Sequence, residues 1–224
     1  MKINIIAPDS NTEKIEGFTI VVDVFRAFST AYYIQEKNPL KYILSESIEH
    51  SWQLKNANKN SILIGEREGY KIEGFNFGNS PTEIAGSDFS RNVVIHTTTN
   101  GTRGVLAQPV DNEVVVGSFV NLQALLNHIY DNKIQTVNIY CTAPKDTLYG
   151  EEDWVFADYL KARLTGENSS FEDVIVKLRN GTGRGFVEET FAPYTDFLMC
   201  MDINRFDFIL RRKLINGLIL LEVV

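Results

Sequence analysis

The sequence predicts an α/β protein with a three-layer α/β/α arrangement and a mixed, largely parallel sheet. Two observations lead to this fold class. Short runs rich in Val and Ile alternate along the chain with segments of helical character, which is the pattern of repeated β-α-β units. Several of these runs are apolar at every position, as expected for strands that are buried on both faces of a sheet.

The elements follow from this pattern in chain order. The predicted strands are Ile3–Ala7, Thr19–Val24, Tyr42–Leu44, Ile62–Gly65, Val93–His96, Val114–Gly117 and Val137–Cys141. The predicted helices lie between them and are Ser29–Glu36, Ser47–Ala57, Thr102–Gln108, Asn121–Asp131 and Glu151–Thr165. No internal repeat and no linker interrupts this order, so we expect a single domain over residues 1–224.

Two stretches are less regular. Residues 66–90 are rich in Gly, Asn, Ser and Pro but contain two Phe residues, which indicates an ordered functional loop rather than a disordered one. Beyond residue 168 the pattern indicates a helix at Phe171–Leu178 and a loop at Gly181–Gly185. Strands at Phe206–Leu210 and Leu218–Val224 are then expected to close the sheet.

Composition narrows the function classes. The chain of 224 residues has 44% hydrophobic and 23% charged residues, which is ordinary for a globular protein. Its net charge of −7 argues against a nucleic-acid partner, because neutralising phosphates drives most of that affinity. With two cysteines and no apolar run as long as a membrane span, we expect a soluble, cytoplasmic protein without a membrane partner. The composition does not decide whether the protein forms a homodimer.

Polar residues follow the predicted strands, where doubly wound sheets bind their ligands. Asp23 ends one apolar strand and Arg26 follows in the next turn. The hydroxyl-rich segment Thr97–Arg103 contains a Gly and opens a predicted helix. Free amides at a helix start and a forked arginine suit a phosphate or carboxylate. The ordinary alternatives are a buried ion pair or helix cap at the first place and a capped turn at the second.

Two further junctions have the same character. Glu66 and Arg67 directly follow a predicted strand, and Gly78–Pro81 has the residues of a turn that starts a helix. The acidic run Glu151–Asp153 begins a helix. The helix dipole is enough to explain that run, although Mg²⁺, which prefers oxygen ligands, is an alternative. No Walker A loop, Gly-x-Gly-x-x-Gly loop, Cys-x5-Arg loop or Gly-x-Ser-x-Gly elbow occurs in the sequence.

Taken together, these segments resemble the 2-phosphosulfolactate phosphatase family. The resemblance rests on VDVFRAFSTA (22–31), GEREG (65–69), GFNFGNSP (74–81), TTNGTRG (98–104) and GEEDWVFADY (150–159), in the family's order. It implies an Mg²⁺-dependent hydrolase that converts 2-phospho-3-sulfolactate to 3-sulfolactate and phosphate, a step toward coenzyme M. It also implies a three-layer α/β/α fold. Phe28, Asn76 and Thr142-Ala143 depart from the family pattern. We expect Phe28 to fill part of a pocket and Asn76 to remove a charge from the metal site.

A hypothesis that fits these residues is metal-assisted phosphoryl transfer to water. The predicted catalytic residues are Asp23, Arg26, Glu66, Arg67 and Arg103. The predicted substrate-binding residues are Asn79, Ser80, Thr98, Thr99, Asn100, Gly101, Thr102 and Arg184. The predicted Mg²⁺ ligands are Asp23, Glu66, Glu152 and Asp153. Direct attack by water and attack by the Asp23 carboxylate both remain open, as does a non-catalytic protein that binds a small phosphorylated or dicarboxylic acid.

Overall fold

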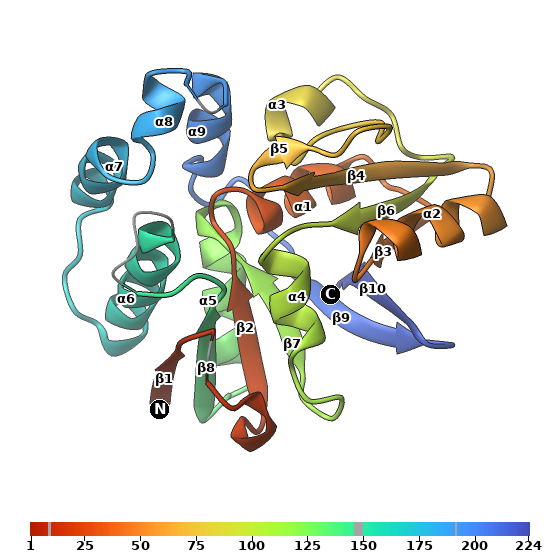
Figure 1. Ribbon diagram of the computed structural model, residues 1–224. Coiled ribbons are helices and arrows are strands. Elements are labelled where there is room, and N and C mark those ends of the chain that lie inside the picture. The colour runs from red at the N-terminus through yellow and green to blue at the C-terminus, as the bar shows by residue number, and fades with distance from the viewer. Residues whose placement is uncertain (9, 146–149, 191) are drawn as a thin grey trace.

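The computed structural model describes residues 1–8, 10–145, 150–190 and 192–224. Within these ranges the strands are β1 (Lys2–Ile6), β2 (Phe18–Val22), β3 (Lys41–Leu44), β4 (Ser61–Arg67), β5 (Tyr70–Lys71), β6 (Val93–Thr97), β7 (Val114–Gly117), β8 (Thr136–Cys141), β9 (Leu210–Ile215) and β10 (Leu218–Val223). They form a ten-stranded sheet in the order β1-β8-β2-β7-β9-β10-β3-β6-β4-β5 (Figure 1).

The helices are α1 (Ala27–Glu36), α2 (Ile48–Ala57), α3 (Pro81–Ile84), α4 (Gly101–Leu106), α5 (Leu122–Asp131), α6 (Glu151–Thr165), α7 (Phe171–Asn180), α8 (Arg184–Val187) and α9 (Tyr194–Cys200). Two short 3-10 helices are η1 (Thr12–Lys14) and η2 (Phe119–Asn121). None of the helices in the described ranges has the length and apolar character that crossing a membrane requires.

Two groups of parallel strands make up most of the sheet. One group is β1, β8, β2 and β7, and the other is β3, β6 and β4. The antiparallel hairpin of β9 and β10 lies between them and pairs with β7 on one side and β3 on the other. The predicted fold class, a mixed and largely parallel α/β sheet, is therefore confirmed.

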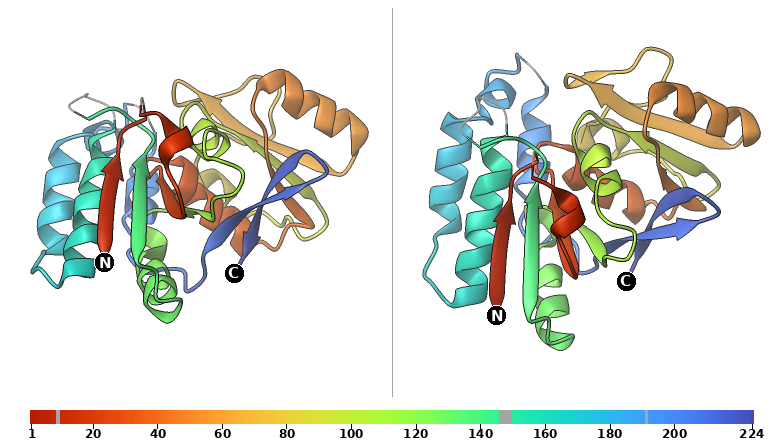
Figure 2. Two further views of the ribbon diagram at one scale, coloured as in Figure 1. Left: turned by 90° about the horizontal axis from the view of Figure 1, so that it is seen from below. Right: turned by 60° about the horizontal axis from the view of Figure 1, so that its bottom comes forward.

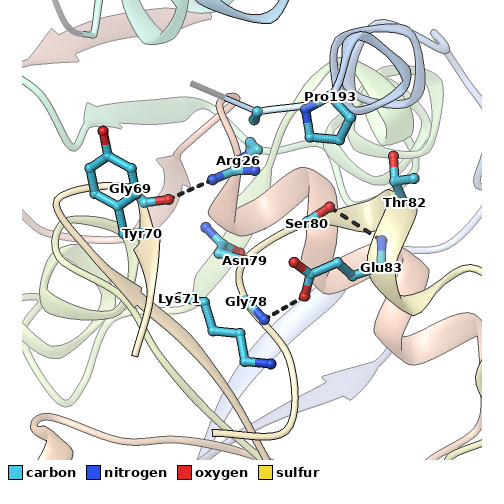
Figure 3. A pocket seen from close by; sticks show the side chains of 11 residues that line it. Arg26, Gly69, Tyr70, Lys71, Gly78, Asn79, Ser80, Thr82, Glu83 and Pro193 are labelled. Carbon is cyan, nitrogen blue, oxygen red and sulfur yellow. Dashed lines mark hydrogen bonds between the residues drawn. The ribbon is translucent and has the colours of Figure 1, made fainter. Parts of the chain in front are cut away.

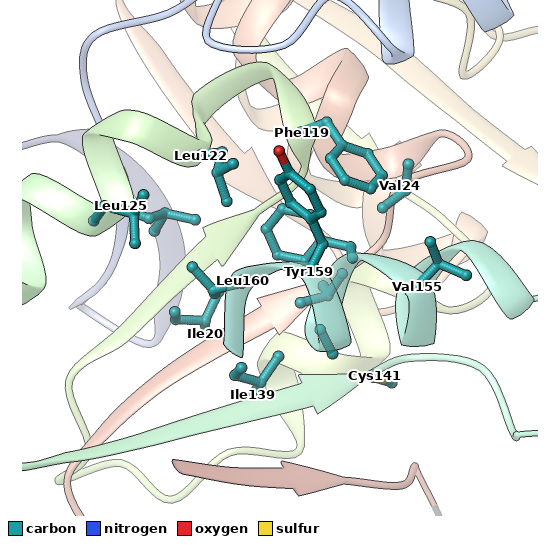
Figure 4. Close-up of a cluster of buried hydrophobic side chains, with 14 of the residues drawn as sticks. Ile20, Val24, Phe119, Leu122, Leu125, Ile139, Cys141, Val155, Tyr159 and Leu160 are labelled. Carbon is teal, nitrogen blue, oxygen red and sulfur yellow. The ribbon is translucent and has the colours of Figure 1, made fainter. Parts of the chain in front are cut away.

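Helices cover both faces of the sheet because side chains alternate along each strand. In β2, Ile20 and Val22 pack with α5, α6 and α7 in one cluster (Figure 4). Val21, between them, packs on the opposite face with α1 and with Val105 of α4. In the second group, Leu63 of β4 belongs to a smaller cluster beside α2. In the two views of Figure 2, α6 and α7 lie beside β1, and the β9–β10 hairpin lies toward the opposite side.

The carboxyl ends of the two parallel groups meet. Across the three antiparallel pairings from β7 to β3 the groups run in opposite directions, so in a flat sheet these ends would lie at opposite edges. Twist accumulates from strand to strand, and Figure 1 shows β2 and β4 steeply inclined to each other. As a result, Asp23 after β2 lies against Gly101 after β6. The site develops at this meeting point.

Most predicted elements are confirmed with bounds within about two residues, and the differences have local causes. Residues 66–90 are ordered, as expected, but contain β5 and α3 rather than loop alone. The strand predicted at Phe206–Leu210 is wrong, because β9 begins at Leu210 and Phe206 instead packs its ring against Tyr32 and Tyr33. The predicted Gly181–Gly185 loop runs into α8, and α9 was not predicted.

Candidate active site

Asp23 is the buried acid at the end of β2. Its Oδ1 accepts a hydrogen bond of 2.9 Å from the Ala27 amide at the start of α1, and its Oδ2 lies close to Gly101 at the start of α4. Burial is the main cause that raises its pKa from 3.8 to about 7, and the charges of Glu66 and Glu152 raise it further. A carboxyl group that exchanges its proton near neutral pH is suited to proton transfer or to binding a cation.

Glu152 and Asp153 open α6 and extend this acid cluster. Burial raises the pKa of both side chains, and for Asp153 the charges of Asp23 and Glu152 raise it further. The two differ in their bonds. Asp153 accepts from the Val24 amide at 2.9 Å and from the amide and hydroxyl of Thr142 at 3.1 and 3.0 Å. In contrast, Oε2 of Glu152 is buried without a hydrogen-bond partner among the described residues. Asp153 thus joins the ends of β2 and β8, whereas Glu152 has an oxygen available.

Glu66 holds two turns together. Its Oε2 accepts from the Gly69 amide at 2.7 Å, within the β4–β5 turn. The same carboxylate accepts from the amide and hydroxyl of Thr99 at 2.6 and 3.0 Å. Because these donors come from two segments, Glu66 fixes the β4–β5 turn against the turn that follows β6. Its negative charge also reaches Asp23, as the raised pKa of that residue shows.

Arg26 is buried and pairs with an acid that sequence reasoning did not identify. Its Nη1 lies 2.6 Å from Oδ2 of Asp196 in α9, and its Nη2 donates to the Gly69 carbonyl at 2.9 Å. The other oxygen of Asp196 accepts from the Ser80 hydroxyl at 2.7 Å and the Thr82 amide at 3.0 Å. In the sequence, Asp196 is one acidic residue in the first turn of an unpredicted helix, and nothing local indicates its partner.

The turn after β6 has the hydroxyl groups and glycine that the sequence indicated, but its amides are engaged. The Thr102 amide donates to the Thr98 hydroxyl, the Thr98 amide donates to the Thr102 hydroxyl, and the Thr99 amide donates to Glu66. Asn100 is exposed at the N-cap of α4. These amides would have to leave their present acceptors before they could bind a phosphate.

Gly101 is needed because two helix starts approach closely at this position, and its φ is not positive. A Cβ at this position would lie 2.7 Å from Cβ of Ala27 and 2.8 Å from Oδ2 of Asp23. Contacts this short do not occur between real side chains. The glycine therefore lets the start of α4 lie directly against the start of α1.

The three remaining predicted arginines have different surroundings. Arg67 donates to its neighbour's carbonyl at 2.6 Å and to the Thr97 hydroxyl at 3.0 Å. Arg103 is exposed on α4, and its guanidinium has no hydrogen bond or ion pair with any residue that the structure describes. Arg184 is exposed and pairs with Glu188 at 2.7 Å, so the structure does not bring its guanidinium together with the acid cluster.

The three departures from the family pattern have structural roles. Phe28 is buried in the core with Tyr32 and does not fill a pocket, so that expectation is wrong. Asn76 accepts from the Leu63 amide at 2.9 Å, which places it beside the middle of β4 rather than in the acid cluster. The Thr142 hydroxyl donates to Asp153. The expectation that Asn76 removes a charge from the metal site is therefore also wrong.

Asn79 and Ser80, predicted to bind substrate, line a pocket beside Arg26 (Figure 3). The pocket has a volume of about 270 Å³ and lies between the β4–β5 turn, the segment before α3 and the segment before α9. Asn79 is buried, and its Oδ1 has no hydrogen-bond partner among the described residues. Ser80 caps α3 by accepting from the Glu83 amide at 3.2 Å.

The residues present suit Mg²⁺ only in part. Among the described residues, no group of three or more His, Cys, Asp or Glu side chains is arranged to hold a metal ion. The carboxylate oxygens of Asp153 and Glu66 accept hydrogen bonds from protein amides, whereas Oε2 of Glu152 is buried without a partner among the described residues. Burial raises the pKa of Asp23, and the charges of its acidic neighbours raise it further. A cation beside Glu152 and Asp23 would relieve this repulsion, and carboxylate oxygens are ligands that Mg²⁺ prefers.

Sequence comparisons agree with the motifs. The family model described as 2-phosphosulpholactate phosphatase matches residues 5–181. Three similar proteins are each named "Probable 2-phosphosulfolactate phosphatase". The protein from Thermoplasma volcanium is 26% identical over 216 residues, covering 94% of this chain and 98% of the relative. The one from Deinococcus radiodurans is 30% identical over 183 residues (80% and 75%), and the one from Thermoplasma acidophilum is 35% identical over 150 residues (66% and 65%).

Proposed function

Because this chain belongs to the 2-phosphosulfolactate phosphatase family, we propose that it hydrolyses 2-phosphosulfolactate, or a related 2-phospho-carboxylate, to the hydroxy acid and phosphate. Membership makes the chain a phosphoric monoester hydrolase, and the alternative of a non-catalytic binding protein is set aside. The observation that carries the proposal is the buried group of Asp23, Glu66 and Glu152 at the joined carboxyl ends of the sheet.

We further propose Mg²⁺ as the cofactor, held through Glu152 and Asp23 with Glu66 beside them. When bound, the ion supplies positive charge that offsets the negative charge of the ester and of the acid cluster. Asp153 supports this site by fixing β2 and β8 to the start of α6. Arg103, exposed and without a described partner, supplies a donor group for the phosphate.

Arg26 and Asp23 have the remaining roles in the proposed reaction. Arg26 follows Asp23 in the chain by three residues and lines the pocket of Figure 3, and its ion pair with Asp196 fixes its orientation. Asp23 is the group suited to hold or release a proton near neutral pH, because its pKa is raised to about 7. In its ionised form the same carboxylate is the nucleophile for a covalent route. A test for a phosphorylated Asp23 by mass spectrometry after rapid acid quenching separates the two routes.

The test of the proposed function is phosphate release. Purified protein is assayed with 2-phosphosulfolactate, 2-phospholactate, 2-phosphoglycerate and glycerol 2-phosphate, each with Mg²⁺ and with EDTA. We expect turnover of the 2-phospho-carboxylates with Mg²⁺ and little or none with EDTA. The Asp23→Asn protein serves as the control for contaminating phosphatases. Equal activity of that variant, or release from glycerol 2-phosphate alone, would contradict the proposal.

A further inference from the structure

The turn between α7 and α8, residues 181–183, lies against the first turn of α6. In the fold α7 packs beside α6, and α8 packs beside α9 (Figure 1). A Cβ at Gly181 would be 2.6 Å from Oε2 of Glu151 at the start of α6. On the other side, a Cβ at Gly183 would be 2.6 Å from the ring of Phe197 in α9. The turn is therefore held closely between α6 and α9, and Thr182 is its middle residue.

The hydroxyl group of Thr182 lies next to Glu152 of the acid cluster. Burial is the main cause that raises the pKa of Glu152, and the Thr182 hydroxyl acts in the opposite direction. The two groups nevertheless form no hydrogen bond, since Oγ1 of Thr182 and Oε2 of Glu152 are both buried without a partner among the described residues. Glu152 is 7% exposed, and a buried polar atom without a partner costs free energy. Two neighbouring oxygens therefore lack a group that satisfies both.

A cation is the group that suits these two oxygens. A carboxylate and a hydroxyl both offer oxygen lone pairs, and a Ser or Thr hydroxyl is a ligand of Mg²⁺ in phosphate-binding loops. A water molecule could also satisfy both atoms, but it would leave the charges of Asp23, Glu152 and Asp153, which raise one another's pKa, without compensation.

The acid cluster needs an oxygen from another kind of residue. Among the described residues, no three His, Cys, Asp or Glu side chains are arranged around one ion. Mg²⁺ takes several oxygen ligands and accepts neutral oxygens besides carboxylates. The Thr182 hydroxyl is such an oxygen, and it approaches Glu152 from outside the sheet.

We propose that Thr182 belongs to the cation site and that its hydroxyl oxygen and Oε2 of Glu152 hold a divalent cation between them, a proposal that rests on the proposed function. The cation then fixes the α7–α8 turn to the start of α6. In the sequence, Thr182 lies between two glycines in a segment with no sign of a ligand. Its role follows from the packing of that turn against α6.

The experiment measures cation binding directly, without substrate and without turnover. Protein freed of metal with EDTA is titrated with MgCl₂ in a calorimeter. Thr182→Val removes the hydroxyl and keeps the branched shape, whereas Thr182→Ser keeps the hydroxyl. Thr190→Val is the matched control, because Thr190 is exposed after α8 and its hydroxyl donates only to the Gly185 carbonyl at 3.4 Å.

We expect Thr182→Val to raise the Kd for Mg²⁺ about tenfold, while Thr182→Ser and Thr190→Val bind Mg²⁺ as tightly as the native protein. Glu152→Gln should raise the Kd as well. The double variant should bind little more weakly than Glu152→Gln alone, because both oxygens hold the same ion. The melting temperature of Thr182→Val in EDTA should change little, since its hydroxyl has no described protein partner.

An unchanged Kd in Thr182→Val would overturn the assignment, as would a Thr182→Ser protein that binds as weakly as Thr182→Val. A loss of stability in EDTA without a change in Kd would make the hydroxyl structural and would also overturn it. Should Thr182→Val fail to fold, Thr182→Ala takes its place in the comparison with Thr182→Ser.

The binding measurement separates this proposal from the proposed function. Weaker Mg²⁺ binding by Thr182→Val supports the site even if no ester is hydrolysed. Phosphate release by a native protein whose Mg²⁺ affinity does not depend on Thr182 would overturn the site and leave the proposed function intact. If the native protein binds no Mg²⁺ at millimolar concentration, the site is wrong whatever the activity.

Discussion

Nη1 of Arg26 and Oδ2 of Asp196 lie 2.6 Å apart, both buried, although 170 positions separate the two residues in the sequence. Asp196 also accepts hydrogen bonds from the Ser80 hydroxyl and the Thr82 amide. Through this one carboxylate, α9 is fixed to the start of α1 and to the start of α3. The pair therefore joins the late part of the chain to the first motif of the site.

Replacing Asp196 with Ala should lower the free energy of unfolding by about 3–5 kcal/mol, because it leaves the Arg26 charge buried without its partner. Urea denaturation measures the change. Glu188→Ala, which breaks the exposed pair with Arg184, is the control and should have little effect. If the two variants were equally stable, the buried pair would not be what holds α9 in place.

Gly101→Ala should reduce both stability and activity, because the added Cβ would meet Ala27 and Asp23 at less than van der Waals distance. Overpacking of this kind costs about 1–3 kcal/mol. Gly86→Ala is the matched control, since a Cβ there has no heavy atom within 4 Å and Gly86 has no positive φ. Thermal melting and phosphate release are measured for both. A harmless Gly101→Ala would show that α1 and α4 separate readily.

Glu152 and Asp153 should respond differently to removal of their charge. Glu152→Gln should raise the Mg²⁺ concentration for half-maximal activity about tenfold or more, with little loss of stability in EDTA, because its Oε2 has no described protein partner. Magnesium titration of phosphate release measures this effect.

Asp153→Asn should instead lower the free energy of unfolding by about 1–3 kcal/mol, because an amide group cannot accept from both Val24 and Thr142. Its Mg²⁺ requirement should change less than that of Glu152→Gln. Thr142→Val, which removes one donor to Asp153, tests the same support. A large Mg²⁺ effect confined to Asp153→Asn would return Asp153 to the metal site as a ligand.

Without divalent cations, stability should fall as the pH rises from about 4 to about 7. The pKa of Asp23 is about 7 in the folded chain and 3.8 as its ordinary value, so the folded state binds the proton more tightly than the unfolded state. The resulting contribution is present below pH 3.8 and is lost as the pH passes through 7. It corresponds to at most about 4 kcal/mol. The raised pKa values of Glu152 and Asp153 act in the same direction.

Urea denaturation in EDTA at several pH values tests this dependence. The Asp23→Asn protein should show a flatter profile, and Mg²⁺ should restore stability at pH 8 because it binds the ionised carboxylates. If the free energy of unfolding instead rose between pH 5 and pH 8 in EDTA, ionisation of the acid cluster would not destabilise the folded protein. In that case the buried carboxylates would not need a cation.

The sequence predicted the parts of this molecule that depend on neighbouring residues. Apolar runs such as Val137–Cys141 located the strands, because burial on both faces leaves a continuous Val and Ile pattern. Asp23 and Glu66 were found because they lie at the carboxyl ends of such strands, Asp23 directly after β2 and Glu66 near the end of β4. Asp196 was not found, because its role depends on a residue 170 positions away. The Phe206 run resembled a strand because packing against an aromatic cluster requires the same apolar residues.

The position of the β9–β10 hairpin has a consequence for biosynthesis. β9 and β10 are the last strands of the described sheet to leave the ribosome, yet they lie in its centre between β7 and β3. Until residues 210–223 emerge, the nascent chain has two separate half-sheets, and the apolar edges of β7 and β3 have no hydrogen-bonding partner. Such edges pair readily with other chains. Nascent chains stalled before residue 210 are therefore expected to depend on chaperones that bind exposed strands, and this dependence should end once the hairpin is inserted.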